Sequence, residues 1–135
     1  MIGATNDKKI ILITFLLTFI SCKSYGELTV NEVISRAEEL NGKKVTINGF
    51  FSAGIFYENR DAYENFTAEF LKVPILGEWK EGYYKHCKSK NVLITGVYTK
   101  LDLKGELGNY LFDITEFRPV DLPNINCLDF LEPWD

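Results

Sequence analysis

The chain has 135 residues, which is enough for one domain of ordinary size and too few for two. Its hydrophobic content of 46% and aromatic content of 14% are sufficient for a packed core, which excludes a disordered chain. The formal net charge is -4, and it becomes -6 without residues 1–26, which hold three lysines and one aspartate, so the composition disfavours non-specific binding to phosphate backbones.

The N-terminus has the anatomy of an export leader. Lys8 and Lys9 precede an unbroken run of Ile, Leu, Phe and Thr over residues 10–20. This run is about half as long as a helix that spans a bilayer. A cleaved signal peptide over residues 1–26 is therefore favoured over a transmembrane anchor and over an apolar helix retained in the fold.

Two processing sites compete after this run. Residues 19–22, Phe-Ile-Ser-Cys, resemble the lipobox of bacterial lipoproteins, which would make Cys22 the lipidated first residue of the mature chain. Residues 24–26, Ser-Tyr-Gly, offer an ordinary signal peptidase small side chains and would leave a soluble periplasmic or secreted protein that begins at Glu27. We favour the lipoprotein, anchored to the membrane of the cell envelope through its N-terminal lipid.

The remaining cysteines, Cys87 and Cys127, are an even number in an oxidising compartment, and we predict that they form a disulfide. A bridge that closes a loop of about forty residues contributes about 2–4 kcal/mol to stability. It would also fix a C-terminal tail, residues 121–135, against the domain. Two buried free thiols are the alternative.

The first element after the leader is an amphipathic helix over residues 30–40. Thr29 and Glu32 have the spacing of a capping box, and Asn41-Gly42 supplies a stop. The apolar residues at helical spacing are Val30, Val33, Ile34, Ala37 and Leu40.

A strand pattern occurs twice, at residues 45–51 and 92–98, with a glycine at the same offset in each copy. Because glycine packs nothing in a strand, Gly49 and Gly96 indicate a bend, a bulge or a close backbone approach. The two copies are expected to pair with each other. Alternation in the first copy points Phe50 outward, where it is either covered by the N-terminal helix or open to a partner.

Three further strands are predicted at residues 55–57, 66–73 and 109–118. Residues 75–90 show no clean period and form an aromatic and basic connection, whereas residues 101–108 are expected to be a hairpin loop. The candidate packing residues of the last strand are Tyr110, Phe112, Ile114 and Phe117.

Five strands in this order close most simply as an antiparallel barrel, which removes exposed edges. The segment at 38–51, which contains Asn-Gly-Lys-Lys-Val-Thr-Ile-Asn-Gly-Phe, resembles the opening of small exported bacterial OB-fold-like proteins. Residues 90–98 and 110–117 are similar to their closing strand pair. The resemblance implies a mainly β fold, a five-stranded antiparallel OB-like barrel over residues 27–120 with an N-terminal amphipathic helix. It transfers no catalytic residue.

No catalytic, metal or cofactor site emerges from the motifs. His86 is the single histidine. His86 and Cys87 are adjacent, but a zinc site needs a second pair of ligands, which the sequence does not supply. Gly105 and Gly108 flank Glu106, whose charge opposes a phosphate. We therefore predict a protein that is not an enzyme and has no cofactor.

The sequence predicts a non-catalytic binding or interaction module of the cell envelope, with a protein or small ligand as partner. Candidate contact residues are the aromatic side chains and the lysines of the one basic neighbourhood. These residues are Phe50, Tyr57, Tyr83, Tyr84, Lys85 and Lys88. The alternative is an oligonucleotide-binding module, since OB barrels stack bases on aromatic side chains beside basic grooves. The net acidity and the predicted export make nucleic acid the less favoured partner.

Overall fold

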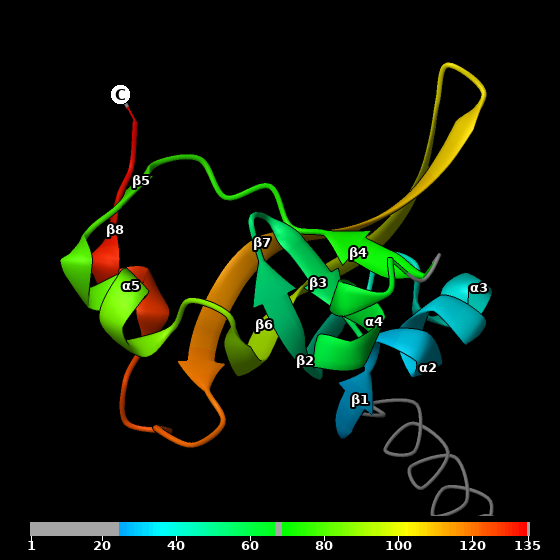
Figure 1. Cartoon of the computed structure of the whole chain (residues 1–135). Helices are drawn as coiled ribbons and strands as arrows, with labels where there is room; N and C mark the ends of the chain where they lie inside the picture. Colours follow the sequence, from blue (N-terminus) through cyan, green and yellow to red (C-terminus); the bar gives the residue numbers. More distant parts are fainter. Residues whose placement is uncertain (1–24, 67–68, 135) are drawn as a thin grey trace, which may run out of the picture.

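A computed structural model describes residues 25–66 and 69–134 of the protein, which is mainly β, as predicted (Figure 1). Within these residues a mixed sheet contains β1 (Glu27–Thr29), β2 (Lys44–Ser52), β3 (Ile55–Tyr57), β4 (Phe70–Lys72), β6 (Lys90–Leu103) and β7 (Glu106–Pro119). A separate pair consists of β5 (Glu78–Trp79) and β8 (Leu131–Glu132). The helices are α2 (Val30–Ser35), α3 (Ala37–Leu40), α4 (Arg60–Glu64), α5 (Glu81–His86) and the 3-10 helix η1 (Cys127–Phe130).

The strand order departs from the predicted antiparallel set of five. β2 pairs with β1 and β3 along one edge and with β6 along the other, and the pairings continue from β3 through β4 and β7 to β6. Two of these pairings, β1 with β2 and β4 with β7, are parallel. β1 escaped prediction because three residues are too few to show an alternating pattern.

The two copies of the repeated pattern are neighbours, β2 and β6, in antiparallel register. Val45 lies opposite Gly96, and Gly49 lies opposite Val92. A Cβ atom on Gly49 would lie 2.5 Å from the carbonyl oxygen of Tyr57, and one on Gly96 would lie 2.6 Å from the carbonyl oxygen of Phe112. Both glycines therefore allow a close backbone approach, as the repeat indicated.

The helix predicted over residues 30–40 is divided into α2 and α3. The capping box is present, because the Thr29 hydroxyl accepts from the Glu32 amide and the Glu32 carboxylate accepts from the Thr29 amide. The break is at Arg36, whose φ of -108° and ψ of 29° are not helical. Its amide is shared between the carbonyls of Glu32 and Val33, a bifurcated bond typical of helix ends. The buried residues of the two segments keep the predicted helical spacing: Val30, Val33, Ala37 and Leu40.

The strand predicted over residues 66–73 is shorter in the structure. β4 begins at Phe70, and Phe66 has a φ of 51° and is 84% exposed. Residues 67–68 lie outside the described residues. Before this point α4 forms because the Asn59 side chain accepts from the Ala62 amide and caps the helix.

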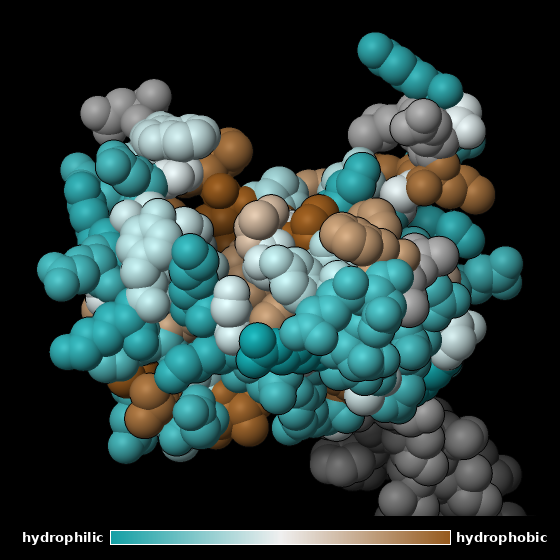
Figure 2. All heavy atoms as spheres, in the orientation of Figure 1, coloured by the Kyte–Doolittle hydropathy of each residue, from teal (hydrophilic) through white to brown (hydrophobic). Residues whose placement is uncertain are grey.

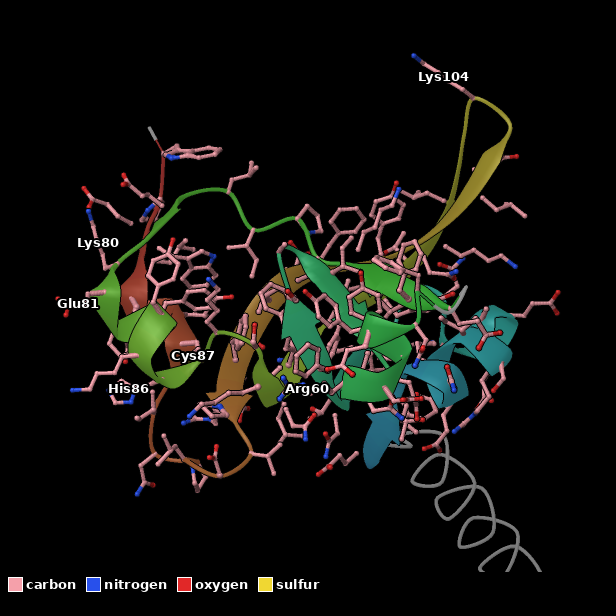
Figure 3. The ribbon with its side chains drawn as sticks, in the orientation of Figure 1. Arg60, Lys80, Glu81, His86, Cys87 and Lys104 are labelled. Atoms are coloured by element: carbon pink, nitrogen blue, oxygen red, sulfur yellow. A yellow bond between two sulfur atoms is a disulfide. The ribbon has the colours of Figure 1, made fainter. Side chains whose placement is uncertain are left out.

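The hairpin between β6 and β7 is longer than predicted, because residues 101–108 are mostly strand. Its turn consists of Lys104 and Gly105, with φ values of 57° and 81°. Two residues with positive φ form the kind of turn that matches the twist of paired strands. Figure 3 shows Lys104 at the tip of this hairpin.

The core residues of β7 differ from the predicted set. Phe117 is fully buried, and so is Leu111, whereas Tyr110 and Phe112 are half-buried. Ile114 is partly buried and packs against the core. Leu111 and Phe117 lie on the same face of β7, six residues apart, and Tyr110, Phe112 and Ile114 alternate with them on the other face. The register shift passes from Glu116 to Phe112 on β7 while β6 advances from Thr95 to Val97, so it leaves this alternation unchanged.

The chain after β7 returns to α5. Cys87 and Cys127 lie in disulfide geometry, with their Sγ atoms 2.12 Å apart, which agrees with the predicted pairing. The Lys80 amide donates to the Phe130 carbonyl at 2.7 Å, and β5 pairs with β8.

In the described part of the chain no helix has the length and apolar character that crossing a bilayer requires. The predicted leader and Cys22 lie outside the described residues.

Candidate functional site

The segment that carries the candidate site is α5, which the end of the chain holds in place. The Tyr83 amide donates to the Lys80 carbonyl and closes the first turn. The disulfide at Cys87 fixes the other end of the helix, and the ring of Phe130 packs so closely on Gly82 that a side chain there would collide with it. Figure 3 shows Lys80 just before the first turn of α5 and His86 at the other end of the helix, both on the side away from the sheet.

Aromatic rings from β5 and α5 pack against one another. The indole of Trp79 stacks on the ring of Tyr83, with centroids 4.1 Å apart and an interplanar angle of 15°. Both rings meet the buried Phe117 edge-on, at 5.9 and 6.5 Å. Tyr84 meets Tyr83 edge-on at 5.4 Å, so the cluster runs from the core to the surface.

This cluster forms one wall of a cavity of about 440 Å³, here called the aromatic pocket. Its volume lies in the range of small-molecule sites. The other walls are the β2–β3 turn and the chain that follows β4. The lining residues are Phe51, Ser52, Ala53, Gly54, Val73, Ile75, Trp79, Tyr83, Tyr84 and Lys88. Residues 51–54 therefore meet residues 73–88 at this pocket.

Polar side chains, Tyr83 and Lys88 among them, distinguish the pocket from a purely apolar cavity. Tyr83 is 4% exposed, and burial raises the pKa of its hydroxyl to about 12, with a smaller contribution from Tyr84. The ammonium group of Lys88 lies 5.5 Å from the centre of the Tyr84 ring, a cation–π contact at the rim. Among the residues that the structure describes, Lys88 is the one charged side chain of the lining.

A second aromatic surface lies on the outside of the sheet. Tyr57 and Phe70 are cross-strand partners with ring centroids 6.1 Å apart. The Lys72 ammonium lies 5.7 Å from the centre of the Tyr110 ring, which stacks on Phe112 at 5.4 Å. We call these five side chains the outer aromatic face. Figure 2 shows the molecule hollowed between the β6–β7 hairpin and the C-terminal end, with apolar side chains at the base.

Four members of this face, Phe70, Lys72, Tyr110 and Phe112, were missed as candidate contact residues. Phe70 and Lys72 alternate with the buried Leu71, which is a readable signal for an exposed face. On β7 the same alternation, counted from the buried Leu111 and Phe117, places Tyr110 and Phe112 on the outer face, so this signal was also readable.

The predicted contact residues are only partly brought together. Tyr83, Tyr84 and Lys88 line the aromatic pocket, and Tyr57 belongs to the outer aromatic face. Lys85 is exposed on α5 and does not line the pocket.

Phe50 requires a correction. Its side chain points outward, as expected, but is only 2% exposed. The ring of Tyr63 from α4 covers it, with centroids 5.2 Å apart. Phe50 is therefore neither open to a partner nor covered by the N-terminal helix, because the segment after β3 folds back over it.

A smaller cavity of about 350 Å³ adjoins Phe50, and its charges are already paired. Arg60 binds Glu64 at 3.0 Å, and Lys90 lies 4.0 Å from Asp121. Because each cation has a carboxylate partner, this cavity is a weaker candidate than the aromatic pocket.

His86 lies at the end of α5 with its ring centroid 6.1 Å from that of Phe130. Among residues 25–66 and 69–134 no three His, Cys, Asp or Glu side chains are grouped so that they could hold a metal ion.

Comparison with family models, with curated proteins and with solved structures finds no match to this chain.

Proposed function

We propose that the protein is an exported, non-catalytic binding module that takes a ligand in the aromatic pocket. The observation that carries this proposal is the convergence of Trp79, Tyr83, Tyr84 and Lys88 with the β2–β3 turn around one cavity. Rings that are held rigidly by packing offer contact area at low entropic cost. A few polar groups on an otherwise apolar wall are the usual composition of a ligand site.

The proposal includes an OB-like barrel as the scaffold. Its support is the order of pairings, because the series β2, β3, β4, β7 and β6 returns to β2. The link between β4 and β7 is one residue pair, Lys72 with Tyr110. In OB folds the loop between the first two strands contributes to ligand binding, and here the corresponding turn lines the pocket.

The proposal also places the module at the cell envelope, attached through a lipid on Cys22. Tyr25 packs against the core, and its ring lies 5.6 Å from the Arg36 guanidinium. Three residues span at most about 11 Å, so a lipidated Cys22 would hold the folded domain close to the bilayer. Intact mass of the protein from membrane and soluble fractions tests this. A start at Glu27 without acyl mass would contradict the lipid anchor.

Ligand binding is tested by the fluorescence of Trp79. The other tryptophan, Trp134, is 67% exposed, so Trp134→Phe leaves Trp79 as the single reporter within the pocket wall. A library of small organic compounds is titrated against this variant, and a saturable change in emission is expected for compounds that enter. Tyr84→Ala should abolish the change because it removes part of the lining.

A matched control is Tyr57→Ala, which alters the outer aromatic face and leaves the pocket lining intact. It should preserve the response to every compound that Tyr84→Ala abolishes. If both variants behave alike, or if no compound changes Trp79 emission, the pocket is not the binding site.

The outer aromatic face favours one alternative function, the binding of a single-stranded oligonucleotide. Tyr110 and Phe112 form a parallel stack beside the Lys72 cation, and bases stack on such platforms. Titration with labelled oligothymidine tests it. Binding that weakens with salt and is lost in Tyr110→Ala would establish this alternative, and absence of binding at low salt would remove it.

A further inference from the structure

We propose that the aromatic pocket is selective for small organic anions, specifically a planar ring that carries one acidic group such as a carboxylate or a sulfonate. This inference rests on the proposed function and adds the ligand class. It follows from the charge of the pocket, from an unpaired hydroxyl in its wall and from the position of one lysine.

The charge of the pocket is opposite to that of the protein. The domain after residue 26 has a net charge of -6, yet among the described residues the lining contains Lys88 and no aspartate or glutamate. Glu132, on the neighbouring strand β8, is paired with Lys80. Lys88 is exposed at the rim of the pocket, so it can attract an anion to the opening, and salt should weaken this attraction.

The second observation is the hydroxyl of Tyr83. In the described part of the chain this hydroxyl has no hydrogen-bond partner, although the residue is only 4% exposed. No side-chain oxygen or nitrogen among the described residues is both unpartnered and sealed from solvent, so this hydroxyl keeps some contact with solvent, and its residue lines the pocket. A tyrosine hydroxyl donates one hydrogen bond, and an anionic oxygen is its strongest acceptor.

The third observation is the position of Lys88. Its ammonium group lies over the Tyr84 ring and pairs with no carboxylate among the residues described. The backbone amide of Lys88 donates to the Tyr83 carbonyl at 3.0 Å, which fixes the start of this side chain beside the hydroxyl-bearing residue. Because both residues line the same pocket, we assign both groups to one acidic group of the ligand, with the ligand's ring against the aromatic wall.

The test compares two fluorescent probes of similar shape. Anilinonaphthalenesulfonate is an anion, and phenylnaphthylamine is its neutral counterpart. Binding of each is measured with the oxidised protein purified from the cells that export it, carrying its natural mature N-terminus. We expect the anion to bind about tenfold more tightly than the neutral probe, as a charge-assisted hydrogen bond predicts.

Three variants locate the effect. Tyr83→Phe keeps the ring and removes the hydroxyl. It should lower the affinity for the anionic probe about tenfold and change the affinity for the neutral probe by no more than about twofold. Lys88→Gln should lower the affinity for the anionic probe several-fold and reduce the salt dependence of its binding. Lys85→Gln is the matched control on the same helix, because Lys85 is exposed and outside the lining, and it should change neither probe.

The outcomes separate this inference from the proposed function. Equal affinity for both probes, with both lost in Tyr84→Ala, would overturn the selectivity for anions and leave the pocket as a binding site. Equal losses in Lys85→Gln and Lys88→Gln would also overturn it, because the effect would then be general surface charge. If neither probe responds to Tyr84→Ala, the proposed function itself fails.

Discussion

The indole of Trp79 stacks on the ring of Tyr83, with their centroids 4.1 Å apart. Each ring is held in place by a different part of the C-terminal segment. Trp79 lies on β5, which pairs with β8 after the 3-10 helix, and Tyr83 lies on α5, which ends at the disulfide. The wall of the aromatic pocket thus depends on the C-terminal segment, and loosening that segment should disturb both rings together.

Removing the disulfide should therefore lower both stability and pocket order. Cys87→Ser with Cys127→Ser frees a loop with a sequence separation of 40 and should reduce the free energy of unfolding by about 2–4 kcal/mol. Denaturant unfolding measures this, and Trp79 emission in the Trp134→Phe background should shift toward that of solvated indole. Stability equal to that of the oxidised protein would show that the bridge contributes nothing.

Tyr83 should titrate later than an ordinary tyrosine. Burial raises its pKa from 10.0 to about 12, so the neutral form is favoured in the folded state. Its contribution to stability is fully present below about pH 10 and is lost as the pH rises toward 12. In Tyr83→Phe the fall in stability between these values should be shallower.

The control for this titration is Tyr98, whose pKa burial also raises, and whose hydroxyl donates to Asn109 at 2.5 Å. Absorbance of phenolate against pH should show late-titrating tyrosines in the folded protein, and Tyr83→Phe should remove one of them while Tyr98 remains. An unchanged late phase in Tyr83→Phe would contradict the assignment.

The glycines of the repeat should resist even a single methyl group. Gly49→Ala and Gly96→Ala place a Cβ atom 2.5 and 2.6 Å from backbone oxygens, which cannot move as a flexible side chain can. Each should lower the free energy of unfolding by about 2 kcal/mol or more, as denaturant unfolding would measure. Gly26→Ala is the control, since nothing lies within 4 Å of the position that its new methyl group would take, and it should be near neutral.

The β2–β3 turn should respond in opposite directions at its two positions. Ala53 has a φ of 50° and Gly54 a φ of 80°, both in the left-handed region. Ala53→Gly relieves about 1–2 kcal/mol of backbone strain in the folded state. It also raises the conformational entropy of the unfolded chain, which costs about 0.4–1 kcal/mol of stability, so the net gain in stability should be about 0.5 kcal/mol. Gly54→Ala should destabilise by about 1 kcal/mol. Thermal unfolding of the pair measures this, and equal signs would contradict it.

Much of the β architecture could be predicted because its signals are local. The alternation in residues 45–51 indicated the buried face of β2, and the repeated strand pattern indicated that β2 and β6 pair. The shared glycine offset indicated a close backbone approach, which is made to β3 at Gly49 and to β7 at Gly96. The capping box at Thr29 formed as predicted, because its partners lie three residues apart.

Other features depend on contacts between distant segments. The register shift between β6 and β7 next to Gly96 is one such feature, because it is set by the pairing of two strands. Phe50 is buried because α4 folds back onto it, which no alternation within β2 can indicate.

Residue type and short spacing were thus enough to predict most of the strand-forming segments and the pairing of Cys87 with Cys127. They were not enough to predict which aromatic residues share a surface. Residues 51–54, 73–79 and 83–88 meet at one pocket through strand pairing and a disulfide. The side chains that face each other there are set by packing between segments far apart in the chain, and no local pattern records that packing.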